Sequence, residues 1–138
     1  MTTTAEIADF IATDFPQNNC IIEASGDTGA TVRHKIGERE LRPGGTVSGP
    51  VLMAVADFAL YVAILGEIGI VPMTVTTSLN INFLRKPTAD RDIIGECTLI
   101  KKGTASMVGD VNLYSEGDDR PVAHAVGTYS IPTVDNEG

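Results

Sequence analysis

The segment Pro50–Leu65 constrains the fold of this chain more than any other part of the sequence. It reads PVLMAVADFALYVAIL, and Asp57 carries its only charge. A run that has helical length and is apolar on every face is typical of a helix enclosed by the rest of the protein. It is shorter than the ~20 residues that span a membrane and it carries a charge, so we expect a buried core helix. A lone carboxylate in such a helix is costly to desolvate, which indicates that Asp57 has a function.

Composition predicts one domain over residues 1–138, because 43% of the 138 residues are hydrophobic and can build one substantial core. The net charge of −8 argues against nucleic acid and anionic membranes as partners, since both attract basic surfaces. Cys20 and Cys97 match no metal or redox spacing. The N-terminal segment MTTTAEIADF lacks the basic stretch and the apolar run of a signal peptide. We therefore expect a cytoplasmic protein with reduced thiols, no metal and no cofactor.

A short amphipathic helix is expected near the N-terminus. Thr3 and Glu6 have the spacing of a capping box, in which the side chain of each accepts a hydrogen bond from the backbone N–H of the other. Pro16 is expected to end this helix. Its apolar stripe is formed by Ile7, Phe10 and Ile11.

Strands are expected in most of the remaining sequence. Val75–Leu84 alternates with a period of two, the pattern of a sheet with one face on the core. One face is expected to carry Val75, Thr77, Leu79, Ile81 and Phe83, and the other Thr76, Ser78, Asn80 and Asn82. Further strands are expected at Cys20–Ala24, Ala30–Lys35, Ile93–Lys102, Ala105–Ser115 and Val122–Ile131, the first two joined by a turn at Gly26–Gly29. Small side chains at Ala123, Ala125 and Gly127 share one face, which would let a helix lie close to the sheet.

The predicted order is a helix, two strands, the buried helix and an antiparallel meander, which fits an α+β domain with one sheet covering one helix. This order, with the glycine-rich loop Leu41–Gly49 before a helix that carries one acid, resembles the hotdog fold. The resemblance implies an antiparallel β-sheet wrapped around one long central hydrophobic helix.

Within that fold, the chain most resembles the PaaI-like acyl-CoA thioesterase family. The family has a His-Gly-Gly motif nine residues before its catalytic acid, and here Ser48-Gly49-Pro50 precedes Asp57 with the same spacing. The segment Asn80–Pro87, NINFLRKP, loosely matches the family's Asn-x-x-aromatic-Leu-Arg-x-Pro pattern with one added residue. The resemblance covers about Cys20 to Ile131 and implies a thioesterase acting on acyl-CoA, with coenzyme A as part of the substrate.

The resemblance also implies roles for individual residues. Asp57 suits a general base or a nucleophile in thioester hydrolysis. The backbone N–H of Gly49 would stabilise the oxyanion, because free N–H groups and the dipole at a helix N-terminus favour negative charge. Thr76 is the candidate for holding the attacking water, with Thr77 as the less well aligned neighbour.

The spacing of Gly49 and Asp57 predicts a dimer. Eight residues of helix separate the two, which at ~1.5 Å per residue is about 12 Å along the axis. Both groups must lie within ~3 Å of one reacting centre, so a single helix cannot supply both. Two antiparallel copies can, which places the site at a two-fold interface of a homodimer. Whether dimers pair into a homotetramer is left open.

Other polar residues have less specific assignments. Ser48 and Pro50 are expected beside the substrate, although Ser48 also suits a helix N-cap. The candidates for contact with the coenzyme A phosphates are basic residues at strand ends: Arg85, Lys86 and Arg91 at one end, and Lys101 and Lys102 at another. His34 and His124 lie in predicted strands far from Asp57 and are interpreted as structural. Neither cysteine has a base nearby in the sequence, so neither is expected to be the nucleophile.

Two alternatives to hydrolysis stay open. A hotdog hydratase or dehydratase has a similar proline- and glycine-rich loop, but it needs a histidine beside the acid, and none occurs between His34 and His124. A non-catalytic acyl-ligand binding protein is favoured by three departures from the family pattern: Ser48 replaces the histidine, Pro50 a glycine and Arg42 an asparagine. The acyl group is not predicted by the sequence.

Overall fold

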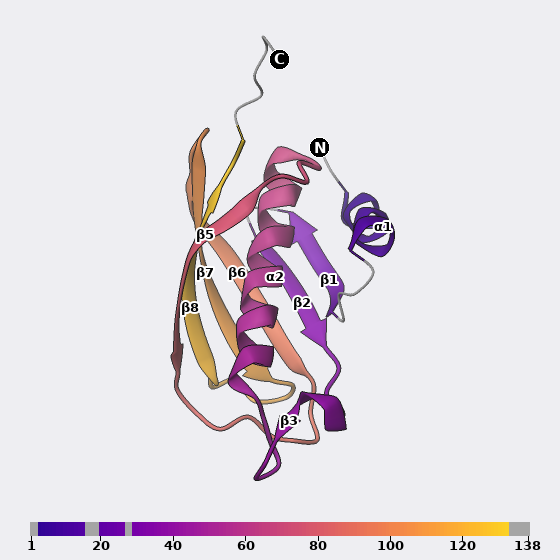
Figure 1. Ribbon diagram of the computed structural model, residues 1–138, viewed down its shortest axis with the longest axis vertical. Coiled ribbons are helices and arrows are strands. Elements are labelled where there is room, and N and C mark those ends of the chain that lie inside the picture. Colours follow the sequence, from indigo (N-terminus) through magenta and orange to yellow (C-terminus); the bar gives the residue numbers. More distant parts are fainter. Residues whose placement is uncertain (1–2, 16–19, 27–28, 133–138) are drawn as a thin grey trace.

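The computed structural model describes residues 3–15, 20–26 and 29–132. The long helix α2 (Gly49–Ile68) lies along the concave side of a curved six-stranded antiparallel sheet, as Figure 1 shows. The strands, in their order across the sheet, are β1 (Cys20–Gly26), β2 (Gly29–His34), β6 (Ile93–Lys102), β7 (Ser106–Ser115), β8 (Ala123–Ser130) and β5 (Val75–Phe83). Helix α1 (Thr4–Asp14) contacts β1 and α2, and its predicted capping box is present. The predicted hotdog architecture is therefore confirmed; Pro16, expected to end α1, lies outside the described residues.

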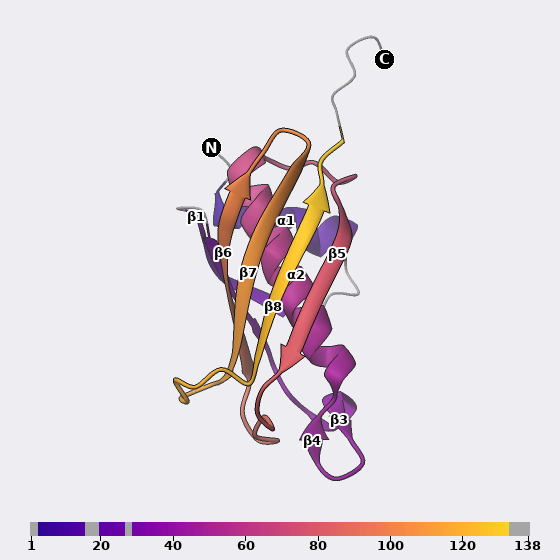
Figure 2. The same ribbon diagram turned by 90° about the vertical axis from the view of Figure 1, so that its left-hand side faces the viewer.

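The glycine-rich loop before α2 contains regular secondary structure that the sequence does not predict. It follows the 3-10 turn η1 (Glu38–Glu40) and contains a small hairpin of β3 (Leu41–Arg42) and β4 (Thr46–Val47), visible below the sheet in Figure 2. Gly44 and Gly45 have φ angles of 100° and 75°, which only glycine adopts readily. The backbone N–H of Ser48 donates to the carbonyl of Glu40, 2.9 Å away, which fixes the start of α2 against η1.

Small residues in the sheet let α2 pack closely, as predicted. Leu60 of α2 is fully buried against Gly127 of β8 and Gly109 of β7. A Cβ on Gly127 would stand 2.5 Å from one methyl of Leu60, and a Cβ on Gly109 would stand 2.3 Å from the other. No side chain other than hydrogen fits at these two positions without moving the helix.

One side of α2 is not covered by the sheet of its own chain. Pro50, Met53 and Ala54 are exposed, and Asp57 and Tyr61 on the same side are only partly buried. The prediction of a helix enclosed on all faces is therefore wrong for the single chain. The length argument against a membrane helix is also wrong, because α2 has 20 residues; however, 61% of its most apolar window is buried within the protein.

A β-bulge corrects the predicted faces of β5. Thr76 pairs with Tyr129 and Ser78 with Thr128, so Thr77 is the additional residue. The bulge turns Thr76 toward the helix, while Thr77 is exposed and its hydroxyl donates to the carbonyl of Thr128. The strict alternation that placed Thr77 on the core face fails here, because one extra residue reverses the phase of a strand.

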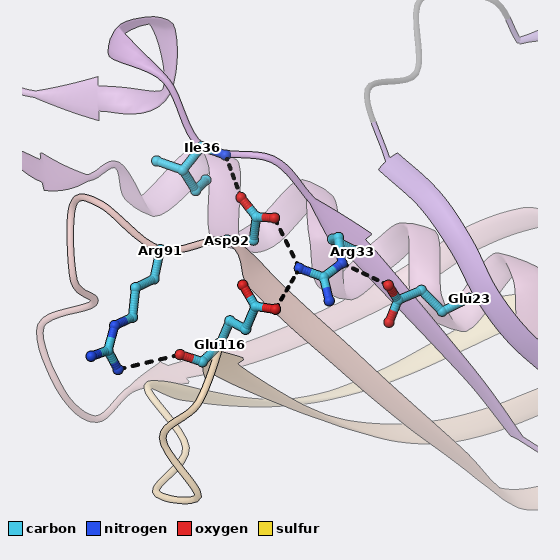
Figure 3. A network of polar contacts seen from close by, with 6 residues as sticks. All are labelled: Glu23, Arg33, Ile36, Arg91, Asp92 and Glu116. Atoms are coloured by element: carbon cyan, nitrogen blue, oxygen red, sulfur yellow. Dashed lines mark hydrogen bonds and ion pairs between the residues drawn. The ribbon is translucent and has the colours of Figure 1, made fainter.

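An ion-pair network fixes the end of the sheet nearest the β3–β4 hairpin. Arg33 of β2 contacts Glu23 of β1, Asp92 before β6 and Glu116 after β7, at 2.6, 2.9 and 3.0 Å (Figure 3). Hydrogen bonds to Glu23, Asp92 and Glu116 raise the pKa of Arg33 still further above its ordinary value. Asp92 also accepts a hydrogen bond from the backbone N–H of Ile36, in the segment that leads to η1.

Candidate active site

The Asp57 carboxylate is held by two hydroxyl groups of the sheet. Oγ1 of Thr76 and Oη of Tyr129 each donate to Oδ1 of Asp57 at 2.8 Å. Thr76 and Tyr129 are cross-strand partners on β5 and β8, and the bulge in β5 turns the Thr76 hydroxyl toward the oxygen that Tyr129 also contacts. Among the described residues, no donor bonds to Oδ2, the other oxygen of the carboxylate.

Tyr129 was not predicted as a site residue. It is 3% exposed, and its ring stacks on Tyr61 of α2 with the centroids 5.9 Å apart. Burial, followed by the adjacent Asp57 carboxylate, raises the pKa of Tyr129 well above its ordinary value, so its hydroxyl remains a donor at neutral pH. A signal was present in the sequence, because Tyr129 continues the period-two face of Ala123, Ala125 and Gly127.

A pocket of about 610 Å³ opens beside Asp57. Five of the seven aromatic side chains of the chain line it, which makes its walls mainly apolar: Phe10, Phe15, Phe58, Tyr61 and Tyr129. Asp57 and Thr76 contribute polar groups to the same lining. The pocket thus combines an apolar volume with an oriented carboxylate, the arrangement expected of a site that binds an apolar group and acts on a polar bond.

The start of α2 bears out the capping interpretation of Ser48. Its side chain accepts from the backbone N–H of Val51 at 3.4 Å, and Pro50 stands in the first turn, where its missing N–H has no helical partner. Gly49 is the first residue of α2, so its own N–H has no partner within the helix. The ring of Phe83, at the end of β5, lies 3.5 Å from the point where a Cβ would stand on Gly49.

The basic residues divide into two groups. Arg85 and Lys86 are exposed and directly follow Leu84 at the end of β5, beside the start of α2. Arg91 instead donates to the carbonyl of Glu116, and Lys102 pairs with Glu67 at 3.4 Å. Arg91 and Lys102 therefore have contacts within the chain.

The structure brings together His34 and Cys20, which are distant from each other and from Asp57 in the sequence. Both line the same pocket as Asp57, and Nδ1 of His34 lies 3.5 Å from Sγ of Cys20. The sequence separation of these residues from Asp57 concealed this, because β2 reaches the pocket only through the order of strands in the sheet. His124, by contrast, is half-exposed and contacts Asp110 at 2.9 Å without lining the pocket. Within the described parts of the chain, no group of three or more His, Cys, Asp or Glu side chains is placed to hold a metal ion.

Comparison with known proteins identifies the family. The sequence profile of the thioesterase superfamily matches residues 44–122, which include α2, β5, β6 and β7. The chain belongs to the thioesterase superfamily. A candidate thioesterase from Silicibacter sp. TM1040 is 40% identical, with a TM-score of 0.88 over 96% of this chain and 93% of that one. Among curated proteins, no sequence matches this chain.

More distant structures share the fold of this thioesterase-superfamily protein. The Escherichia coli PaaI protein from the phenylacetic acid degradation operon is 19% identical, with a TM-score of 0.74 over 92% of each chain. A Streptococcus mutans protein bound to acetyl-CoA is 18% identical, with a TM-score of 0.72 over 83% of this chain and 90% of that one. The resemblance to PaaI-like hotdog thioesterases is thereby confirmed, and family membership supports acyl thioester hydrolysis as the general activity.

Proposed function

We propose that this protein hydrolyses acyl-CoA thioesters to a free acid and coenzyme A, with Asp57 as the reacting carboxylate. The observation that carries the proposal is the pair of hydrogen bonds from Thr76 and Tyr129 to a single oxygen of Asp57, at the wall of an apolar pocket. The acetyl-CoA complex of the Streptococcus mutans protein supports coenzyme A as the thiol carrier.

The unbonded oxygen of Asp57 performs the chemistry in this proposal. Thr76 and Tyr129 fix the carboxylate through Oδ1, and Oδ2 is left to accept a proton from water or to attack the thioester carbonyl. The hydrogen of the Thr76 hydroxyl is engaged with Asp57, and its oxygen can still accept a hydrogen bond from the attacking water. Thr76 therefore positions both the carboxylate and the water.

The oxyanion donor is Gly49 of the partner subunit. Within one chain, β5 contacts α2 at two separate points: Thr76 meets Asp57, and Phe83 meets Gly49. β5 is an edge strand with exposed side chains along most of its length, so it can pair with a second copy. Antiparallel pairing about the middle of β5 would set Thr76 opposite the partner's Phe83, and so bring the partner's Gly49 toward Asp57.

The same pairing assigns a place to the coenzyme A. Arg85 and Lys86 follow β5 on the Phe83 side, so in the dimer they would flank the start of α2 that supplies Gly49. Two exposed cations there suit the phosphates of coenzyme A. The acyl group would then extend into the aromatic pocket.

Thiol release from a panel of short, medium, long and aryl acyl-CoAs tests the activity. Asp57→Asn keeps the size of the side chain but removes its charge, and we expect kcat to fall at least about 100-fold. Asp90→Asn, on an exposed loop, is the matched control and should retain full activity. The proposal fails if the wild type releases no thiol from any member, or if Asp57→Asn turns over normally.

Mixed dimers test whether the site is shared between subunits. Gly49→Pro removes the backbone N–H, and Ser48, at φ −73° and ψ 152°, already has the extended conformation that must precede proline. Gly49→Ala retains the N–H and is the control. Each single variant should be inactive, but co-expressed Gly49→Pro and Asp57→Asn chains should regain about a quarter of the wild-type activity, because half of the dimers contain one intact site. No recovery would place both groups in the same chain.

One observation supports a hydratase as the second candidate, since His34 lines the pocket with Asp57. Its ring nitrogens, however, face Cys20 and Glu40. Hydration of an enoyl-CoA without thiol release would favour this alternative over hydrolysis.

A further inference from the structure

Two further reactive side chains, Cys20 and His34, line the pocket that contains Asp57, and Glu40 contacts His34 from outside the lining. Cys20 is the first residue of β1 and pairs across the sheet with His34, the last residue of β2. Sγ of Cys20 lies 3.5 Å from Nδ1 of His34, and Nε2 of His34 lies 3.3 Å from Oε2 of Glu40. A thiol, an imidazole and a carboxylate thus follow one another at hydrogen-bond distance.

The geometry of this group is fixed by the backbone. Glu40 belongs to η1, and its Oε1 accepts a hydrogen bond of 2.7 Å from the N–H of Gly37. Burial opposes the charge of Glu40, but the hydrogen bonds from Gly37 and His34 outweigh it and lower the pKa of this carboxyl. A charged Glu40 can only accept, so Nε2 of His34 carries a hydrogen and Nδ1 is free to accept one from the thiol. His34 is 6% exposed, which holds its ring in this orientation.

We propose that Cys20, His34 and Glu40 form a second nucleophilic centre, at which Cys20 accepts the acyl group of an acyl thioester. Sγ attacks the carbonyl carbon while its proton passes to Nδ1 of His34, and Glu40 stabilises the charge that forms on the ring. The bond between the carbonyl carbon and the coenzyme A sulfur then breaks, and the proton passes to the departing thiolate. The products are an S-acyl Cys20 and free coenzyme A, with no water or oxidant consumed. The inference rests on the proposed function for its acyl donor.

Burial of Cys20 is compatible with this role. It raises the pKa of the thiol to about 12, so the resting sulfur keeps its proton and reacts only as His34 removes it. A serine hydroxyl is a weaker acid than such a thiol, yet it attacks by the same transfer of a proton to histidine.

Cys97 provides an internal control. Burial raises its pKa to about 12 as well, but it faces Gly109 under α2 and is not part of the pocket lining. The two thiols therefore differ in the His34 contact and in access to the pocket.

A pre-steady-state experiment on Asp57→Asn tests the inference, because hydrolysis no longer obscures acylation in that background. Mixing the variant with excess acyl-CoA should give a burst of one thiol per chain and a mass increase equal to the acyl group. The adduct should map to Cys20 and be removed by hydroxylamine. Adding Cys20→Ala should abolish the burst, whereas adding Cys97→Ala should preserve it.

The rates of Cys20 acylation and alkylation in variants of His34 and Glu40 test the roles of these two residues. His34→Asn should slow acylation at least about 100-fold, and Glu40→Gln should slow it less, since Gln keeps the acceptor and loses the charge. Alkylation of Cys20 by iodoacetamide, which needs no acyl donor, should slow in the same order while alkylation of Cys97 stays constant. Melting temperatures of the variants separate these effects from unfolding.

The possible failures are distinguishable. Steady-state hydrolysis by the wild type together with no adduct on Cys20 in Asp57→Asn, or equal reactivity of Cys97, would overturn the inference alone. If the wild type releases one thiol per chain and then stops, the proposed hydrolysis is wrong and the inference is supported. If His34→Asn leaves the rate of Cys20 alkylation unchanged, His34 does not activate the thiol, and the contacts among Cys20, His34 and Glu40 serve only packing.

Discussion

Replacing Tyr129 by phenylalanine should impair catalysis while leaving the fold in place. The change removes one hydroxyl that donates to Oδ1 of Asp57 at 2.8 Å, and the ring can still stack on Tyr61. A hydrogen bond to a charged group contributes about 1.5–3 kcal/mol. We expect the upper part of this range for Tyr129, because its side chain is only 3% exposed. If that energy orients the carboxylate in the transition state, kcat/KM should fall about 10- to 100-fold. The free energy of unfolding should fall by about 1–2 kcal/mol.

Thr76→Val removes the other donor to the same oxygen. In the proposed site Thr76 holds both the carboxylate and the attacking water, so we expect a loss of about 10- to 100-fold. Because one donor can hold Oδ1 when the other is absent, the double variant should lose more than the product of the single losses. The coupling should be at least about 0.5 kcal/mol.

The assay is the initial rate of thiol release over a range of acyl-CoA concentrations, with urea unfolding curves for each variant. Tyr114→Phe on β7 and Thr98→Val on β6 make the same chemical changes outside the pocket, and both should retain wild-type rates. The reasoning is refuted if Tyr129→Phe keeps more than half of the wild-type kcat/KM, or if Tyr114→Phe loses as much. Independent losses at Tyr129 and Thr76 would show that the two hydroxyls do not act through one oxygen.

Two further predictions concern stability and are measured by urea unfolding. Gly127→Val should lower the free energy of unfolding by about 1–3 kcal/mol, because its Cβ would stand 2.5 Å from Leu60. Gly37→Ala is the control and should be nearly neutral, because its Cβ would stand 3.5 Å from the nearest atom. Arg33→Met should destabilise by about 1–2 kcal/mol and less at high salt, because it leaves three carboxylates without their shared cation. Arg120→Met removes a more exposed contact to one carboxylate and should leave the urea midpoint nearly unchanged; an equal effect of the two arginines would contradict the network argument.

The fold could be predicted because its signals are local. Capping boxes, period-two alternation and an apolar run each span a few residues, and the strands β5 to β8 lie within one residue of their predicted limits at either end. The sheet order was not predicted, since it depends on which strands meet across the helix. The β3–β4 hairpin was also missed, because two-residue strands are too short to show a period.

The site was predicted only in part. Asp57 is conspicuous as a lone charge, and Thr76 occupies the position that the family resemblance assigns to the water-holding residue, but the bond between them depends on the bulge at Thr77. A bulge leaves no mark in an alternating pattern of Thr and Ser, where either phase is acceptable. His34 lines the pocket because β2 pairs with β1 and β6. This pairing joins segments that are distant in the sequence, so no local sequence pattern predicts it.

The uncovered side of α2 explains why the sequence predicted a helix enclosed on every face. The apolar side chains of α2 mark the surfaces that are buried in the functional protein. A second chain can cover some of these surfaces. Met53 of α2 is 41% exposed in the single chain, and Phe83, on the edge strand β5, is 53% exposed. A second copy on that edge would cover both residues and satisfy the unpaired backbone groups of β5. Asp57 lies on the same side of α2, so an interface that makes the apolar pattern consistent would also be the one that brings Gly49 of the partner subunit to the carboxylate in the proposed site.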